Sequence, residues 1–592
     1  MKNFFDDPRF YDPRELLGRD ECEGYGTAPR YEGSGEIKVV ENYDDAKSYY
    51  IKAYGATLAD YSAYVDKLEA SGFKKYYSTE TNGNVFSIYT DGYNVLNVSC
   101  VEYADPFKKD NVVKYVCIAI ESTDYTELPP LGGKTEKVTE TEMVMVGTQA
   151  LFIIRLEDGR FIIVDGGVEN CACGSNIEYI YEWLTEKNVL GGKPVIAAWI
   201  ITHAHADHIA GTLRFGQKYS EEVVLERMIF NFPGRVRLDE VIDDPPHNYN
   251  WINNMYTIAV NGCFAKAKTV VAHAGQKFEF GSCGIEILWT HEQLGDRTMI
   301  WGNLMSTIFK VYTPQGDMIF IGDQCHEACK LALAICPDKL KADFVQYGHH
   351  SFYSGSHTFF THTGAKYAIW TNSYENIAKR CHYGMPGYNA VYPNNGIVSI
   401  APTDKEMAIT LRPDMTKSDL AKYIRWEYDA ADFYDPQELF GLEDKETQEY
   451  ANEIEMLFGG DEDAYYAMIS DSRAYHKYGK TLAYFPKALF GKECCKGYGT
   501  APRYEGAGEV RFCENAEKEK AYTIKVCGAS DADYENYVAK IESFGFLLHH
   551  TEEESGDAVY TDGFNILTLS KTDCGFSVAV ECVCHRKFPA FA

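Results

Sequence analysis

The residues best suited to chemistry are three histidines and an aspartate within six positions: His203, His205, Asp207 and His208. They follow the apolar run 194–201, which predicts a buried strand. Imidazoles and a carboxylate placed there need partners, and metal ions can satisfy them together. Alternate residues of an extended segment point the same way, so His203 and His205 can hold one ion. Asp207 and His208, where the chain turns into a helix, are available to a second. A solvated histidine-rich loop is the alternative, but the whole chain has only 16 histidines in 592 residues.

The segment around this cluster alternates predicted strands with predicted helices. Strand pairs separated by short polar turns are predicted at 150–156 with 161–164 and at 307–313 with 318–321. Helical periodicity is found at 177–187 and 327–334. This mixture predicts an α/β domain over residues 137–415, with two sheets or one large mixed sheet.

A duplicated segment flanks that domain. The ten residues Gly24–Gly33 recur identically as Gly497–Gly506, and Ile51-Lys52 aligns in the same register with Ile524-Lys525. Each copy predicts a strand, an amphipathic helix and a run of further strands, so we expect a small α+β domain at 1–136 and another at 481–592. A packing or dimerisation module is favoured over a ligand-binding one. The acidic, tyrosine-rich stretch 416–480 is predicted to be a helical connector.

Composition narrows the function further. A chain of 592 residues is expected to form several domains, and its formal net charge of −30 opposes binding to long nucleic acids. The sequence contains no run of 18 or more uncharged apolar residues, so no membrane span is predicted. The acidic start lacks the apolar core of a signal peptide. The expected location is therefore the cytoplasm, where the 18 cysteines would be reduced.

Four motifs in order carry a family resemblance. The H-x-H-x-D-H run at 203–208 resembles the signature of the metallo-β-lactamase superfamily. Asp165-Gly-Gly after one predicted strand, Gly-Asp323 after another and the later pair His349-His350 resemble further motifs of that superfamily. Asn303-x-x-Ser306 resembles the branch of ComEC-type DNA-uptake proteins and bacterial phosphorylcholine esterases. The resemblance covers the middle domain only.

The resemblance implies an αββα sandwich in the middle domain and two divalent metal ions, zinc best, with manganese or iron as alternatives. It implies hydrolysis of a phosphate ester or phosphodiester by hydroxide formed on the metals. Asp323 would bridge the ions and Asp165 would order the ligand loops. The full set of implied residues comprises His203 and His205 on one ion, Asp207, His208 and His350 on the other, and Asp207 and His349 as catalytic residues.

The sequence departs from the family pattern at one ligand. Many members place a histidine on the loop before the bridging-aspartate strand, where this chain has Asn303, and His291 is an upstream candidate to replace it. Of the pair His349-His350, the second is the favoured ligand, which leaves His349 to contact substrate or protonate a leaving group.

Two functions therefore stay open. One is a hydrolase acting on a small or surface-presented ester. The other is a binding or scaffolding protein that keeps the fold without turnover, which the missing histidine and the duplicated flanks suggest. A β-lactamase is not expected, since Asn303-x-x-Ser306 points to the other branch. The repeats could build a homo-oligomer.

Overall fold

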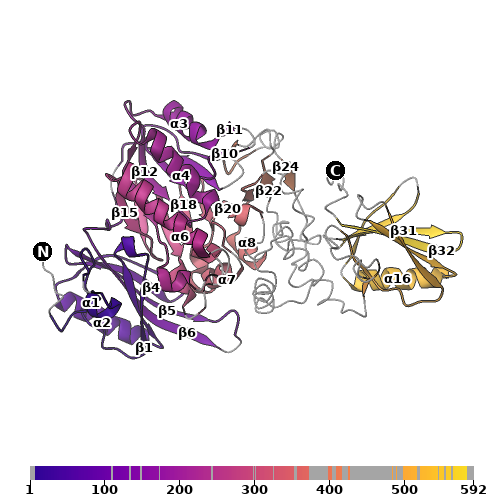
Figure 1. Cartoon of the computed structure of the whole chain (residues 1–592), viewed down its shortest axis with the longest axis horizontal. Coiled ribbons are helices and arrows are strands. Elements are labelled where there is room, and N and C mark those ends of the chain that lie inside the picture. The colour runs from indigo at the N-terminus through magenta and orange to yellow at the C-terminus, as the bar shows by residue number, and fades with distance from the viewer. Residues whose placement is uncertain are drawn as a thin grey trace. The chain divides into compact units, whose positions relative to one another are not determined.

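The computed structural model describes most of the first 372 residues and shorter stretches thereafter. The described residues are 7–19, 21–108, 111–132, 135–146, 150–171, 174–239, 241, 245–295, 297, 299, 302–324, 326–351, 357–372, 398–402, 408–415, 424–426, 483–484, 489, 498–515, 521–544, 546–552, 555–561 and 565–582. The chain divides into two compact units, residues 1–374 with 391–432 and residues 375–390 with 433–592 (Figure 1). Apart from 424–426, the predicted connector 416–480 lies outside the described residues.

The first copy of the repeat forms a six-stranded antiparallel sheet within the first unit. Its strand order is β1-β2-β6-β5-β4-β3, with β1 Glu36–Glu41, β2 Tyr49–Tyr54, β3 Lys74–Thr81, β4 Asn84–Thr90, β5 Asn94–Ala104 and β6 Val112–Ser122. Helix α2 (Leu58–Ala70) begins at a capping box formed by Thr57 and Asp60. It buries Tyr61, Tyr64 and Leu68 against one face of the sheet. The strand and the amphipathic helix predicted for this copy are thus confirmed as β2 and α2.

Two eight-stranded sheets form the middle of the chain, so this region is mixed α/β. One has the order β15-β14-β12-β9-β8-β7-β23, with β13 also pairing with β12, and the other runs from β16 through β17 to β22 and ends at β24. Their bounds are β7 Glu142–Val146, β8 Leu151–Arg155, β9 Phe161–Val164, β12 Val195–Ile200, β13 Val224–Leu225, β14 Arg227–Phe230, β15 Lys268–Val271 and β23 Ala408–Leu411; then β16 Lys277–Phe280, β17 Cys283–Trp289, β18 Ile308–Tyr312, β19 Met318–Phe320, β20 Phe344–Tyr347, β21 Tyr367–Trp370, β22 Val398–Ala401 and β24 Ile424–Trp426.

One hydrophobic core joins these two sheets. It includes Phe152 and Ile154 of β8 together with Phe309 and Phe320 of β18 and β19. The rings of Phe152 and Phe320 meet edge to face with centroids 4.9 Å apart. The two sheets therefore pack face to face, each presenting apolar side chains to the other.

Helices accompany these two sheets. The structure has α3 at Asn176–Lys187, α4 at Ala206–Tyr219, α6 at Pro245–Asn254, α7 at His326–Ile335 and α8 at His357–Thr363. The helices expected at 177–187 and 327–334 are thus confirmed. No helix among the described residues is both long and apolar enough to cross a membrane.

The outer face of the first sheet packs against the middle region within the same unit. Lys52 donates from Nζ to the carbonyl oxygen of Glu292. His273 lies between two carboxylates, with Nε2 3.0 Å from Glu121 Oε1 and Nδ1 2.9 Å from Glu292 Oε2. Asn42 donates from Nδ2 to Glu292 Oε1 over 3.1 Å. We call these five residues the polar lock.

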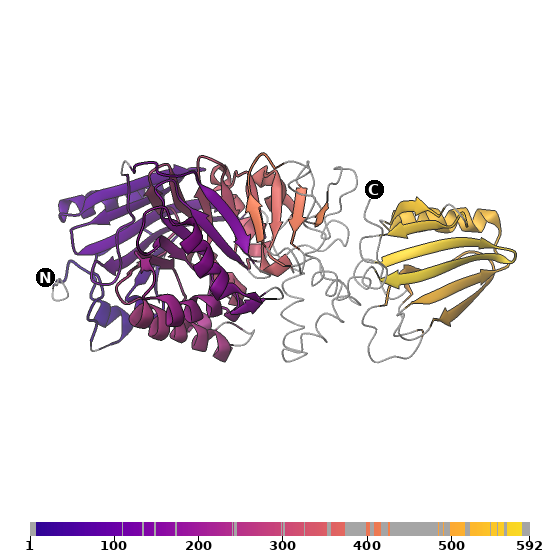
Figure 2. The same cartoon turned by 90° about the horizontal axis from the view of Figure 1, so that it is seen from above.

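The second copy forms a sheet of the same order in the second unit. Its strands follow β27-β28-β32-β31-β30-β29, with β27 Glu509–Glu514, β28 Tyr522–Cys527, β29 Leu547–Thr551, β30 Ala558–Thr561, β31 Asn565–Thr572 and β32 Gly575–Cys582. Helix α16 (Asp531–Ser543) covers one face and begins at an equivalent capping box, Ser530 with Asp533 (Figure 2). Both copies of the duplicated sequence therefore give the same arrangement of strands and helix.

Candidate metal centre

Four candidate ligands are placed by the junction between β12 and α4. His205 is the N-cap of α4, and Asp207 and His208 lie in its first turn. The helix lies tightly against the loop after β9, because a Cβ atom on Gly211 would come within 2.0 Å of the Gly166 carbonyl oxygen. Gly166 N donates to His208 O over 2.6 Å, which ties that loop to the same turn. Glycine at this contact brings the two ligand-bearing segments together.

Asp323 follows the end of β19 and is held by its neighbours' side chains. Its backbone N–H donates to Ser306 Oγ over 3.1 Å. The preceding backbone N–H groups of Ile321 and Gly322 both donate to Gln346 Oε1 over 3.0 Å. Gly322 has a φ of +55°, the left-handed region that glycine adopts without strain.

His349 and His350 follow β20 in a strained backbone conformation. Their φ angles are 49° and 48°, which are unusual for two consecutive residues with side chains. Asn372 donates from Nδ2 to the carbonyl oxygen of His350 over 3.0 Å. His349 N–H donates to Asp323 Oδ1 over 3.2 Å. Strain that is held by surrounding hydrogen bonds is common at functional sites.

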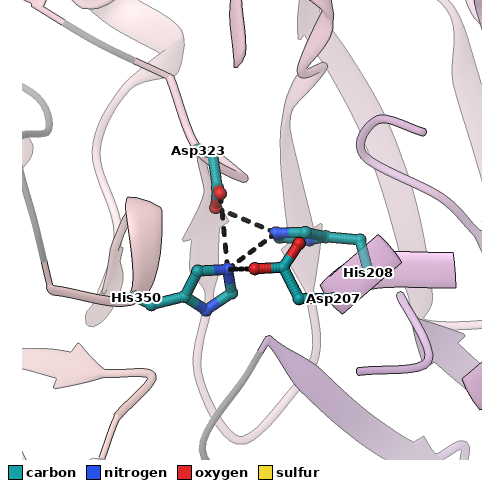
Figure 3. A group of neighbouring side chains, drawn as sticks. All are labelled: Asp207, His208, Asp323 and His350. Carbon is teal, nitrogen blue, oxygen red and sulfur yellow. Dashed lines mark hydrogen bonds and ion pairs between the residues drawn. The ribbon is translucent and has the colours of Figure 1, made fainter. Parts of the chain in front are cut away.

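The first group of converging ligands contains Asp207, His208, Asp323 and His350 (Figure 3). His350 Nε2 lies 2.9 Å from Asp207 Oδ2 and 3.3 Å from Asp323 Oδ2. His208 Nε2 lies 3.1 Å from Asp323 Oδ1 and 3.0 Å from His350 Nε2. One candidate ligand atom from each residue lies within 4.8 Å of all the others.

The second group contains His203, His205 and again Asp323, also within 4.8 Å of one another. His203 is fully buried, and its Nε2 lies 3.8 Å from Asp323 Oδ2. Among the described residues this nitrogen has no hydrogen-bond partner. A buried nitrogen without a partner is costly unless something outside the chain satisfies it. Asp323 is common to both groups.

The residues behind the ligands orient two of the imidazoles. Asp165 Oδ2 lies 2.8 Å from His208 Nδ1, and Asp165 also accepts from Thr202 N and Oγ1 over 2.7 and 2.8 Å. Thr202 Oγ1 lies 3.1 Å from His203 Nδ1. Partners at Nδ1 leave Nε2 of both histidines directed to the centre, as in the outer shell of metal sites. This is the role that the sequence predicted for Asp165.

The two ligand groups differ in the protonation of their histidines. Burial opposes charge on His350, but Asp323 and Asp207 outweigh it and raise the pKa of His350 to about 9. The same balance, with Asp323 and Asp165, raises the pKa of His208 well above its ordinary value. Burial instead lowers the pKa of His203 well below that value. The first group thus favours protonated imidazoles at His208 and His350, while His203 favours the neutral imidazole, whose nitrogen can bind a cation.

These residues fit a pair of divalent cations. The Nε2 atoms of His208 and His350 lie 3.0 Å apart beside two carboxylates. The positive charge of these two rings comes from bound protons, which a metal cation can replace. The pKa values of Asp207 and Asp323 are lowered, because neighbouring imidazoliums outweigh the effect of burial, so both carboxylates are available as anions. A set of nitrogen and carboxylate ligands without thiolate suits zinc, with manganese and iron as alternatives.

Two histidines considered from the sequence lie outside both groups. His349 places Nε2 3.2 Å from Asn303 Nδ2 instead. His291 is buried with Nε2 3.1 Å from Asn231 Oδ1, and burial lowers its pKa to about 3. His291 therefore does not supply the ligand that Asn303 fails to provide. Within the described residues the second group has three protein ligands.

Gln346 is a site residue that the sequence reasoning missed. Its side chain accepts from two consecutive backbone N–H groups before Asp323 and so shapes the turn that carries this ligand. The available signal was a glutamine within the otherwise apolar strand Phe344–Tyr347. A fully buried amide in a strand implies a specific hydrogen-bonding task.

No protein-family model and no curated protein matches the sequence. Several solved structures are similar at low identity. The metallo-β-lactamase fold protein YhfI from Bacillus subtilis is 13% identical, with 40% of this chain and 86% of that chain covered and a TM-score of 0.25. CmlA, a diiron β-hydroxylase from Streptomyces venezuelae, is 15% identical, with 46% of this chain and 54% of that chain covered and a TM-score of 0.29. Yeast PDE1 is 14% identical, with 40% of this chain and 88% of that chain covered and a TM-score of 0.25.

Proposed function

We propose that this chain is a metal-dependent hydrolase with a metallo-β-lactamase-type αββα middle domain, acting on a phosphate ester or phosphodiester. The observation that carries the proposal is the convergence of six side chains on two adjacent ligand groups that share Asp323. They come from the segments after β12, β19 and β20, which lie far apart in the sequence. Two sites that share a carboxylate suit a two-metal hydrolytic centre.

The chain's own residues would perform distinct tasks. When bound, two divalent cations lower the pKa of a coordinated water and balance charge on a phosphate group. Asp207, His208 and His350 would hold one cation, His203 and His205 the other, and Asp323 both. Asp165 keeps the His208 ring oriented through Nδ1. His349, adjacent to His350 but outside the ligand groups, would contact the substrate or give a proton to the leaving group.

The substrate would be small or presented on a surface. The formal net charge of −30 disfavours long nucleic acids, whose binding depends on basic side chains. A cytoplasmic location, where the cysteines would be reduced, and a homo-oligomer formed through the repeats belong to the same proposal.

A non-catalytic binding or scaffolding protein is the second candidate. It is favoured by Asn303 and by the three-ligand group around His203, since fewer ligands give a weaker site. This candidate predicts that the middle domain binds no metal, or binds it without hydrolysing any ester.

The experiment compares metal content and hydrolysis of bis-p-nitrophenyl phosphate in the wild type and the Asp207→Ala/His208→Ala double variant. We expect the double variant to lose activity by more than the ~10–100-fold typical of removing an outer-shell partner. Glu178→Gln, a change of a half-buried carboxylate on α3 that pairs with Lys218 outside both ligand groups, is the control and should retain both properties. Equal residual activity in wild type and double variant would refute the proposal, and bound metal without turnover of any ester would favour the scaffold.

A further inference from the structure

A pair of cysteines lies at one end of the second copy's sheet. Cys527 ends β28 and is partly exposed, while Cys574 is exposed in the turn between β31 and β32. Their sulfur atoms are 3.5 Å apart. The backbone holds them together, because Gly528 N donates to Cys574 O over 2.6 Å and Cys527 pairs with Gly575 across the sheet. The contact is therefore built into the strand pairing rather than left to a loose loop.

The pair is particular to the second copy. By strand register, Cys527 takes the place of Tyr54 and Gly575 that of Tyr115. Tyr54 lies on the face that packs against the middle region, where a Cβ atom on Gly295 would be 4.0 Å from its ring. The second copy thus has a dithiol at one end of the face that the first copy uses for docking.

The surroundings give the two thiols different reactivity. Hydrogen bonds from Thr572 and Cys527 lower the pKa of Cys574, with Thr572 Oγ1 3.6 Å from its sulfur. The hydrogen bond to Cys574 raises the pKa of Cys527. The pKa of Arg511 is raised chiefly by its hydrogen bonds to Glu509, with smaller contributions from the two thiolates, and the Arg511 charge in turn acts to lower the pKa of Cys527. An exposed thiolate beside a cation and a second thiol has the features of a reactive cysteine pair.

We propose that Cys527 and Cys574 form a reversible dithiol–disulfide site that exchanges with low-molecular-weight disulfides such as glutathione disulfide. The Cys574 thiolate attacks one sulfur of glutathione disulfide, forms a mixed disulfide and releases one glutathione thiolate. The Cys527 thiol then loses its proton to solvent and attacks the Cys574 sulfur, which forms the internal disulfide and releases the second glutathione thiolate. Two cysteine thiols are oxidised while one disulfide is reduced to two thiols.

This assignment is independent of the proposed hydrolase activity, because the pair lies in a different compact unit from the candidate metal centre. A disulfide needs the sulfur atoms about 2.0 Å apart, so the pair must close by a small side-chain rotation. Cys513 provides a matched comparison, since it is an exposed cysteine on β27 of the same sheet.

The test exposes the full chain to glutathione disulfide and maps every cysteine by peptide mass spectrometry. The wild type should yield a Cys527–Cys574 cross-linked peptide lighter by two hydrogens, which dithiothreitol reverses. Cys527→Ser should stop at one glutathione on Cys574, and Cys574→Ser should slow modification at position 527 at least about tenfold. Cys513→Ser should change neither the product nor its rate.

Two results would overturn the proposal. One is a wild type in which Cys527 and Cys574 stay reduced under conditions that modify Cys513. The other is modification of each by glutathione at the rate of Cys513 without an internal cross-link. Serine replaces each thiol at an exposed or partly exposed position, and circular dichroism of each variant confirms that the sheet has formed.

Discussion

The two copies of the repeat share a strand order but differ in how many faces of their sheet are covered by other parts of the chain. In the first copy, Tyr49 to Ala53 of β2 are all buried, because α2 covers one face and the middle region the other. In the second copy, burial along β28 alternates, so Tyr522, Ile524 and Val526 are buried while Lys525 is exposed. The alternation shows that one face of this strand lacks a dense cover.

The residues on the face of the sheet away from the helix fall into two classes, polar residues that both copies share and aromatic residues that only the first copy has. The polar residues recur, since register aligns Asn42, Lys52 and Glu121 with Asn515, Lys525 and Glu581. The aromatic residues do not, because Thr523, Cys527 and Gly575 replace Tyr50, Tyr54 and Tyr115. We infer that the tyrosines supply most of the apolar area for docking, while the polar groups set its register.

The largest effect is expected from breaking the polar lock at its centre with His273→Phe. The change leaves the carboxylates of Glu121 and Glu292 buried without the imidazolium between them. Loss of one partner from a buried ion pair typically costs about 3–5 kcal/mol of unfolding free energy. Hydrogen exchange should accelerate in β6 of the first copy.

The second copy serves as the internal control for that variant. Exchange in β32, the counterpart of β6, should not change, because His273 belongs to the other compact unit. A loss of less than about 1 kcal/mol, the scale of an ordinary hydrogen bond, would show that the lock does not stabilise docking.

A matched pair of lysine substitutions sharpens the comparison at equivalent positions. Lys52 is buried, donates to Glu292 O and lies 4.3 Å from the centroid of the Tyr115 ring. Lys52→Met should therefore cost about 1–3 kcal/mol, since it leaves a buried acceptor without its donor. Lys525→Met should stay within about 0.5 kcal/mol, as surface changes usually do. Equal effects of the two changes, measured by denaturant unfolding, would abolish the distinction between the copies.

The pH dependence of stability gives a smaller, graded effect. Burial opposes charge on His273, but Glu292 and Glu121 raise its pKa to about 10, from an ordinary 6.5. The stabilisation is therefore complete below pH 6.5 and is lost as pH rises through about 10. Glu292 has its pKa lowered to about 2 from 4.5, chiefly by His273 against the effect of burial, so its contribution is lost as pH falls through about 2.

The lock should therefore stabilise the first unit most between pH 4.5 and 6.5. Unfolding of the wild type across pH 6.5–10, compared with His273→Gln, isolates the contribution. The wild type should lose on the order of 1 kcal/mol per pH unit relative to the variant. Parallel pH profiles for the two proteins would contradict the assigned protonation.

Much of the local structure was predictable, because periodicity and spacing report local geometry. The apolar run before His203 forms β12, and the amphipathic helix predicted for the first copy is α2. The spacing of His203 and His205 also predicted their convergence. That Asp323 and His350 join them required the family resemblance, because no local pattern shows which distant segments meet.

Other features depend on tertiary context and could not be predicted. Lys52 and Lys525 occupy the same motif, yet Lys52 is buried against the middle region while Lys525 is exposed, which the motif alone does not reveal. The position of His291 in the sequence made it a candidate ligand, but its ring is buried beside Asn231, outside both ligand groups. Gln346 shows the same limit, because its partners come from the adjacent strand end.

The central claim is that the His203–His208 segment, Asp323 and His350 form a two-cation centre. Its most direct test is elemental mass spectrometry of the full chain after chelation, reloading with zinc and desalting. The wild type should retain two ions per chain, Asp323→Asn fewer than one, and the Glu178→Gln control two. A wild type that retains no zinc, or an Asp323→Asn variant that retains as much as the wild type, would contradict the account.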